Sequence, residues 1–337
     1  MTVNVGVMGG GAWGTALAQL LAEKGHDVTL WAFEPEVADE INRIHENRTF
    51  LPDIALSPRV HATHELAKCL GGKGLILSVV PSHAARTVLH QAIEYLPEGV
   101  PIVSAAKGIE NDTLMTMSEM MEDVLPLIYH PMLTFLSGPT FAREVALHHP
   151  TAATVAGRFE RVARKVQECL SGPFFRVYTS TDVTGVELGG SLKNVIAIAA
   201  GAATGLGFGT NTTTSLITRG LNEIIRLALH KGGNPLTMAG LSGMGDLVLT
   251  CLGQLSRNRQ VGEKLGQGMK LTDIVHDMRQ VAEGIRTARS VHDLSRREGV
   301  EMPISDLVYR VLYEDLPARE AVSLLMERAL QRELTFA

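Results

Sequence analysis

Short apolar runs alternate with longer amphipathic stretches along the first half of the chain. Eight of these runs predict β-strands, at residues 3–7, 28–31, 59–61, 75–80, 101–106, 133–136, 151–156 and 174–178. The run at 75–80 is apolar without alternation, which is typical of a parallel strand buried on both faces. Helical patterns separate several of the runs, so the first half predicts an α/β fold with a mostly parallel sheet.

Strand signals stop at Asp182, and only helical patterns follow. The stretch from Val195 to Ala203 is small or apolar on every side, which is typical of a helix without a solvated face. Further helices are predicted and are separated by glycine-rich breaks, at residues 212–229, 257–265, 283–297 and 304–313. The chain therefore predicts two domains that meet near residues 181 and 182.

A glycine-rich turn joins the first predicted strand to the first predicted helix. Gly9, Gly11 and Gly14 have the spacing G-x-G-x-x-G. The first allows a tight turn, the second lets the backbone approach a pyrophosphate, and the third lets helix and strand pack closely. The alternative is a chance glycine-rich turn, but the flanking strand and helix match a dinucleotide-binding site. We predict a Rossmann domain over residues 1–181, followed by an all-α substrate-binding domain over residues 182–337.

The end of the second predicted strand should lie beside the adenosine ribose of a dinucleotide. Glu34 occupies about the position of the acid that binds the ribose hydroxyls in NAD-preferring sites. Phe33 beside it can pack on the adenine, and Arg43 and Arg48 are the nearest cations for a 2′-phosphate. The sequence leaves the choice between NAD and NADP open.

One lysine stands at the start of the apolar helix of the second half. Burial of an ammonium group favours the neutral amine, so Lys193 is a candidate general acid in a cleft between the two domains. The alternative is that Lys193 extends its ammonium group to water from the helix end. Asp246 lies in an otherwise apolar, glycine-rich turn, and it is either a partner of this lysine or the N-cap of a helix.

Three further residues follow predicted strands of the first half. Lys107 comes after the strand at 101–106, and Gly138 and Thr140 come after the strand at 133–136. The carboxyl ends of parallel strands face the ligand crevice in such a sheet. Lys107 is therefore either a cation that holds a substrate oxygen or phosphate, or a solvated loop lysine.

The segment at 256–259 has the composition of an anion site. Ser256 is placed to cap a helix whose first turn offers Arg257, Asn258 and free backbone N–H groups. Such a helix start binds phosphate through its aligned N–H groups and through the two donors of a guanidinium group.

Composition and charge exclude several other classes. The net charge is −5, with 31 Lys and Arg against 36 Asp and Glu and no basic block, which argues against a nucleic-acid partner. Cys69, Cys169 and Cys251 are far apart and odd in number, which favours a reducing cytoplasm over a disulfide framework. His148 and His149 lack the spacing of metal ligands, and we expect no metal. Neither a signal peptide nor a membrane span is predicted.

Taken in order, these motifs resemble those of the bacterial NAD(P)-dependent glycerol-3-phosphate dehydrogenases. The resemblance covers essentially the whole chain, through residues 9–14, 106–108, 137–142, 189–197, 245–250 and 256–259. It implies a homodimer without a metal that reduces dihydroxyacetone phosphate to sn-glycerol 3-phosphate with NADH or NADPH, for phospholipid synthesis.

The resemblance also implies roles for individual residues. Lys193 would be the proton donor or acceptor, assisted in catalysis by Lys107 and Asp246. The residues expected along the substrate are Lys107, Gly138, Thr140, Lys193, Asp246, Ser256, Arg257 and Asn258. Those expected along the cofactor are Gly9, Gly11, Trp13, Gly14, Phe33, Lys107, Ala142, Arg257, Val281 and Glu283. Many relatives have Arg or His in place of Phe33, so a strong NADP preference is not implied.

Two other functions are compatible with parts of the sequence. A β-hydroxyacid or 6-phosphogluconate type of dehydrogenase also combines a Rossmann half with a lysine-bearing helix, although we find no additional carboxylate-binding pattern. A non-catalytic NAD(P)-binding sensor would keep the glycine-rich turn but would have no use for Lys193 and Asp246.

Overall fold

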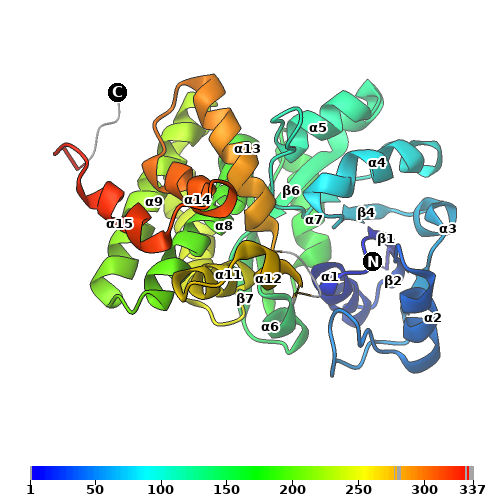
Figure 1. Cartoon of the computed structure of the whole chain (residues 1–337). Coiled ribbons are helices and arrows are strands. Elements are labelled where there is room, and N and C mark those ends of the chain that lie inside the picture. Colours follow the sequence, from blue (N-terminus) through cyan, green and yellow to red (C-terminus); the bar gives the residue numbers. More distant parts are fainter. Residues whose placement is uncertain (1, 277, 279–281, 331, 334–337) are drawn as a thin grey trace. The chain divides into compact units, whose positions relative to one another are not determined.

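The computed structural model describes residues 2–276, 278, 282–330 and 332–333 (Figure 1). It divides into two compact units. Unit 1 comprises Met1–Lys107 and Met117–Val183, and unit 2 comprises Gly108–Thr116 and Thr184–Ala337. The short excursion of residues 108–116 into unit 2 was not expected from the sequence, and the domain boundary at residues 181 and 182 stays a prediction.

Unit 1 is built on one eight-stranded sheet with the order β3-β2-β1-β4-β5-β6-β7-β8. The strands are β1 (Asn4–Met8), β2 (Asp27–Trp31), β3 (Val60–Thr63), β4 (Leu75–Ser78), β5 (Ile102–Ser104), β6 (Leu133–Ser137), β7 (Thr151–Ala156) and β8 (Phe175–Ser180). The first six strands are parallel in the doubly wound order of a Rossmann fold, β7 runs antiparallel to β6, and β8 runs parallel to β7. The prediction of a mostly parallel α/β sheet is therefore confirmed.

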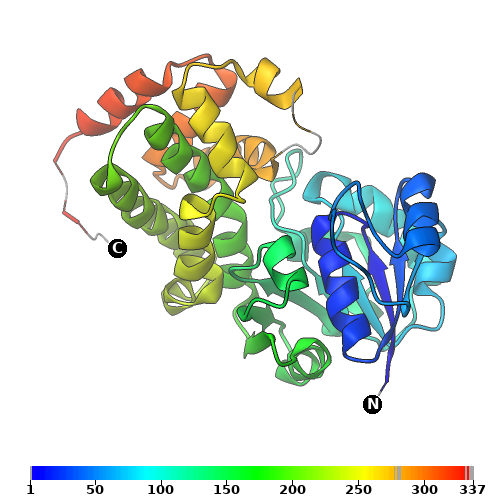
Figure 2. The same cartoon turned by 90° about the horizontal axis from the view of Figure 1, so that it is seen from below.

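Helices cover both faces of this sheet. They are α1 (Ala12–Glu23), α2 (Pro35–Ile44), α3 (Leu66–Leu70), α4 (Ser82–Ala92), α5 (Met117–Val124), α6 (Ala142–Ala146) and α7 (Glu160–Leu170). One face, including Val5, Val7 and Leu77, packs in a single apolar core with α1, α6 and α7. Figure 2 shows α1 lying along the first strands. Gly6 points to the other face, where an added Cβ would meet the backbone of Cys69 on α3, so successive residues of β1 face helices on opposite sides of the sheet.

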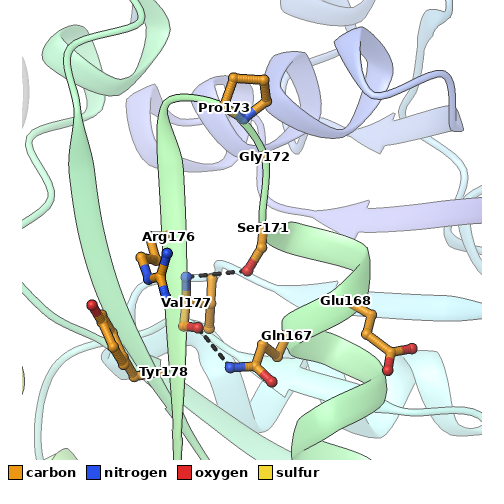
Figure 3. A pocket seen from close by; sticks show the side chains of 8 residues that line it. All are labelled: Gln167, Glu168, Ser171, Gly172, Pro173, Arg176, Val177 and Tyr178. Carbon is orange, nitrogen blue, oxygen red and sulfur yellow. Dashed lines mark hydrogen bonds between the residues drawn. The ribbon is translucent and has the colours of Figure 1, made fainter.

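Strand β8 lies at one edge of the sheet, and its backbone is hydrogen-bonded by the segment that precedes it. The Val177 amide donates to Oγ of Ser171 at 3.2 Å, and the Val177 carbonyl accepts from Nε2 of Gln167 at 2.8 Å (Figure 3). The carbonyl of Phe175 accepts from the amide of Gly172 at 2.8 Å. Gln167, Ser171 and Gly172 line a hollow beside β8. Their hydrogen bonds satisfy backbone groups of the edge strand that would otherwise need water.

Unit 2 consists of helices around a second core. The helices are α8 (Val183–Gly205), α9 (Thr210–His230), α10 (Asp246–Leu252), α11 (Arg257–Gly266), α12 (Leu271–His276), α13 (Glu283–Glu298), α14 (Pro303–Tyr313) and α15 (Ala318–Met326). No strand follows β8 in the part of the chain that the structure describes, as the sequence predicted. Residues 108–116 belong here because Ile109 is buried in this core and its carbonyl accepts from Oγ of Ser290 at 3.2 Å.

Helix α8 is the centre of unit 2 and packs against α11 without intervening side chains. An added Cβ at Gly262 of α11 would overlap the backbone of Ile198 on α8, and one at Gly201 of α8 would overlap the backbone of Arg259. Glycines at these positions let the two helix backbones touch. Although α8 is long and largely apolar, none of the described helices meets the length and hydropathy needed to cross a bilayer.

Candidate active site

Lys193 lies near the middle of α8 and is buried, with 6% of its surface exposed. Its Nζ donates to the carboxylate of Asp246 and, at 2.9 Å, to Oγ1 of Thr250. The sequence-based alternative that Lys193 reaches water is therefore wrong, and the expectation that Asp246 is its partner is confirmed. Burial of an ammonium group is tolerated here because a buried carboxylate and a hydroxyl receive its N–H groups.

Asp246 is the first residue of α10 and is fully buried. A π-turn over Leu241–Gly245 leads into it, and such single turns occur frequently at functional sites. Thr250 lies one turn further along α10, and its Oγ1 also donates to the Asp246 carbonyl at 2.6 Å. Sequence reasoning missed Thr250 as a site residue, although the i, i+4 spacing from Asp246 places both on one helix face.

The meeting of Lys193 and Asp246 depends on a close backbone approach. Gly189 lies one turn before Lys193 on α8, and an added Cβ at Gly189 would overlap the backbone of Ser242 in the π-turn. Any larger residue would push α8 and the π-turn apart. The distance between the helix that carries the lysine and the turn that leads to the carboxylate is thus set by contact between main chains.

A second hydrogen-bonded group lies beside Lys193. The Asn258 side chain donates from Nδ2 to Oδ1 of Asn194 at 2.9 Å, and its Oδ1 accepts from the amide of Gly284 at 2.9 Å. One buried amide therefore links α8, α11 and the first turn of α13. The neighbouring Ser256 caps α11 as predicted, with its Oγ accepting from the amide of Arg259 at 3.2 Å.

Arg257 is the first residue of α11 and is exposed. The residue therefore stands at a helix N-terminus whose first N–H groups and dipole favour an anion. Glu283 begins α13, and Ala142 begins α6 in unit 1. Val281 lies outside the described residues.

Three predicted residues of unit 1 form a separate cluster at the carboxyl ends of β5 and β6. The carbonyl of Gly138 accepts from Nζ of Lys107 at 3.0 Å and from Oγ1 of Thr140 at 3.2 Å. Gly138 has φ of 143°, and an added Cβ would lie 2.9 Å from Cα of Ala153. The cluster therefore holds a cation at the rim of the sheet where the fold places its ligands.

The glycine-rich turn between β1 and α1 fits a dinucleotide. Gly9 has φ of 119°, and an added Cβ at Gly14 would overlap the Gly9 carbonyl. At Gly11, by contrast, an added Cβ would meet none of the described atoms within 4 Å. This open position at the start of α1 is the cradle that a pyrophosphate needs, and a side chain there would fill it.

Aromatic residues flank this turn. Phe33, directly after β2, is 76% exposed and packs edge-on to Trp31 with 6.3 Å between ring centroids. A large exposed ring at the end of the second strand is suited to packing on an adenine. Trp13, in the first turn of α1, has an indole N–H that is buried and without a hydrogen-bond partner among the described residues.

The cysteine next to Thr250 is a buried thiol of low reactivity. Cys251 is 1% exposed, and burial raises the pKa of its thiol to about 12, although the charge of Lys193 acts in the opposite direction. The thiol is therefore protonated and a poor nucleophile near neutral pH. Within the described part of the chain, no group of three or more His, Cys, Asp or Glu side chains is placed to hold a metal ion.

Both units match models of one protein family. Residues 4–163 match the N-terminal model of NAD-dependent glycerol-3-phosphate dehydrogenase, and residues 182–323 match its C-terminal model. The chain is 55% identical over 328 residues to glycerol-3-phosphate dehydrogenase [NAD(P)+] of Anaeromyxobacter dehalogenans, covering 97% of this chain and 99% of the relative. It is 55% identical over 333 residues to the enzyme of the same name from Geobacter sulfurreducens, covering 99% of each.

A solved structure agrees with these matches. Crystalline glycerol-3-phosphate dehydrogenase from Coxiella burnetii is 37% identical and superposes with a TM-score of 0.90, covering 97% of this chain and 99% of that one. D-mandelate dehydrogenase, at 12% identity and a TM-score of 0.66, shares the fold alone. The two models together span most of the chain, and the relatives match over nearly their whole length. The chain therefore belongs to the NAD-dependent glycerol-3-phosphate dehydrogenase family.

Proposed function

We propose that this enzyme reduces dihydroxyacetone phosphate to sn-glycerol 3-phosphate, reversibly, with NADH or NADPH, and so supplies glycerophospholipid synthesis. The observation that carries the proposal is the buried Lys193, held by Asp246 and Thr250 on helices of the family's C-terminal region. A buried ammonium group with two acceptors is a costly arrangement for stability alone. It is well suited to give a proton to an oxygen on which charge develops.

Each residue of this group has its own task in the proposed reaction. A bound nicotinamide cofactor supplies the hydride. Lys193 donates a proton from Nζ to the former carbonyl oxygen of the substrate, and Asp246 orients the ammonium group and balances its charge. Thr250 accepts another N–H of the same ammonium group, which restricts its rotation.

Two cations are assigned to the charges of the substrate. We assign Arg257 to the phosphate, because a small triose offers little apolar surface and must be held by its charge. Lys107 supplies a fixed positive field for the developing oxyanion. The proposed substrate-binding set is completed by residues that hold these cations or contact the substrate, namely Gly138, Thr140, Ser256 and Asn258.

The proposed reaction is tested by the loss of NADH or NADPH absorbance when dihydroxyacetone phosphate is added to the purified protein. A ketone that bears a carboxylate serves as the control substrate. Turnover of the phosphorylated ketone alone is expected. Preference for the carboxylate would favour a β-hydroxyacid type of dehydrogenase, and binding of NADH without consumption would favour a sensor.

We infer that both nucleotides are used. Glu34 and the exposed Phe33 disfavour a 2′-phosphate. Arg43 and Arg48 are cations that favour it, although Arg48 is paired with Glu46 at 3.0 Å. A ratio of kcat/KM for the two cofactors beyond about 10³, equivalent to roughly 4 kcal/mol, would contradict this inference.

We further propose that the enzyme is a cytoplasmic homodimer. Three free cysteines, two of them buried, are compatible with a reducing compartment. The family resemblance supports the dimer, and light scattering coupled to size-exclusion chromatography tests it through the mass of the native protein.

A further inference from the structure

Asn47, in the connection that follows α2, reaches back to the glycine-rich turn before α1. Its side chain is fully buried, and Nδ2 donates to the carbonyl of Gly10 at 2.8 Å and to Oγ1 of Thr15 at 2.8 Å. Its Oδ1 accepts from the amide of Phe50 at 3.1 Å. Thr15 also donates to the Gly10 carbonyl, at 3.3 Å. One carbonyl of the turn is therefore held by two buried side chains.

Holding this carbonyl also orients the next amide. In a trans peptide, the C=O of one residue and the N–H of the next point in opposite directions. When the Gly10 carbonyl points to Asn47 and Thr15, the N–H of Gly11 points away from them. Gly11 is the position at which the turn is open, at the start of a twelve-residue helix whose positive end favours an anion.

Glycines on both sides make this peptide easy to turn over. Rotation of the Gly10–Gly11 peptide changes ψ of Gly10 and φ of Gly11, and neither residue has a Cβ that would resist the change. A reversed peptide would present a carbonyl oxygen, in place of an N–H, to the phosphate groups. The two glycines that let the turn approach its ligand therefore leave the orientation of the Gly10–Gly11 peptide poorly fixed, unless other side chains hold that peptide.

We propose that Asn47 is a positioning residue for the cofactor: its amide fixes the Gly10–Gly11 peptide so that the Gly11 N–H is directed at the pyrophosphate. This role rests on the proposed use of a nicotinamide dinucleotide. Asn47 belongs to none of the motifs that define the cofactor site in sequence, because it acts through the backbone of Gly10 and is itself fully buried.

The substitution Asn47→Asp tests this role with little change of shape. It keeps the oxygen that accepts from Phe50, but it replaces the donor to Gly10 with an oxygen that repels the carbonyl. Asn42→Asp is a control that makes the same substitution at an exposed residue away from the turn, where Asn42 donates to the Ala62 carbonyl at 2.9 Å and accepts from the Ala62 amide at 2.8 Å. Both changes remove one side-chain donor from a backbone carbonyl of unit 1.

The measurements are the Kd of NADH, by fluorescence titration of the full chain without substrate, together with kcat at saturating NADH and the melting temperature. Loss of a hydrogen bond to a charged ligand raises Kd by about ten- to a hundredfold. We expect this increase for Asn47→Asp only, with kcat and the Kd of the Asn42→Asp variant near the wild-type values. A wild-type Kd in Asn47→Asp, equal increases in both variants, or a fall of kcat at saturation would overturn the role.

A second pair of variants covers the case in which Asn47→Asp does not fold. Thr15→Val removes the other donor to Gly10 with almost no change of volume, and a smaller increase of Kd is expected. Its control is Thr134→Val, because Thr134 is equally buried and donates to the Ile102 carbonyl at 3.2 Å. Equal NADH affinities in the Thr15 and Thr134 variants would overturn the role, whereas a wild-type protein that binds no NADH would overturn the proposed function itself.

Discussion

The carboxylate of Glu223 on α9 accepts two hydrogen bonds from Ser305 at the start of α14, from the amide at 3.1 Å and from Oγ at 2.9 Å. The amide of Ile304 donates to the same carboxylate at 2.6 Å. Glu223 is 1% exposed, and burial raises the pKa of its carboxyl group to about 7, although these three donors act in the opposite direction. A helix start in unit 2 is therefore held by an acid that titrates near neutral pH.

This pKa makes the free energy of unfolding depend on pH. The folded protein binds the Glu223 proton more tightly than the unfolded chain, whose carboxyl has a pKa of 4.5. The resulting stability is fully present below pH 4.5 and is lost as the pH rises through about 7. Between pH 5 and pH 8, the wild type should lose about 2–3 kcal/mol more than Glu223→Gln in urea unfolding. Parallel curves for the two proteins would contradict the raised pKa.

Replacement of Lys193 by Met should abolish turnover while NADH still binds. The loss of a general acid typically lowers kcat by about 10² or more. Steady-state kinetics and a fluorescence titration of NADH separate the two effects. A rate within a few-fold of the wild type would remove Lys193 from its assigned role.

The same substitution also leaves Asp246 buried without its cation, which costs about 3–5 kcal/mol of stability. The double variant Lys193→Met/Asp246→Asn should recover much of this stability, because no unpaired charge is left. It should recover none of the activity. Activity that returned together with stability would show that Lys193 has a structural role only.

Arg257→Ala should weaken the enzyme for dihydroxyacetone phosphate by about 2–4 kcal/mol in kcat/KM, comparable to removal of one partner of a buried charge pair. Dihydroxyacetone, which has no phosphate, should be hardly affected. The matched control is Arg259→Ala on the same helix, because Arg259 pairs with Glu263 at 3.4 Å and such pairs are worth little. Equal proportional losses for both ketones would assign Arg257 to the cofactor or to structure.

Gly189→Ala should separate the π-turn from α8 and move Asp246 away from Lys193. A misplacement of about 1 Å in a catalytic group can lower the rate by about 10². Gly205→Ala is the control, because Gly205 lies on the same helix and its added Cβ would also overlap backbone, that of Glu263. Both variants should lose stability, but only Gly189→Ala should lose kcat at saturating substrate. Equal values of kcat would contradict the positioning effect.

The sheet and the main helices could be predicted because their signals are local. Buried parallel strands have continuous apolar runs, and Gly9, Gly11 and Gly14 each meet a steric need that few sequences share. The partnership of Lys193 and Asp246 was also foreseeable, since an isolated charge in an apolar segment needs an opposite charge. Each of these inferences starts from the local sequence around a residue and from elementary energetics.

Other features depend on contacts between distant segments. The π-turn before Asp246 forms where Gly189 admits its backbone, and residues 108–116 join unit 2 through the burial of Ile109. Nothing local marks Asn47 or Glu223 for these roles, because each also binds a backbone group far away in sequence. Sequence patterns predict helices and strands well, but they do not predict which backbone groups a polar side chain will hydrogen-bond.

The hydrogen bonds that Gln167, Ser171 and Gly172 make to β8 limit how this protein can associate with others. A foreign strand that approached this edge would find the amide and carbonyl of Val177 and the carbonyl of Phe175 already hydrogen-bonded. Extension of the sheet there would first require the hydrogen bonds between β8 and the C-terminal end of α7 to break. This part of the sheet margin is thereby less open to pairing with a strand of another molecule, which is the contact through which exposed sheet edges aggregate.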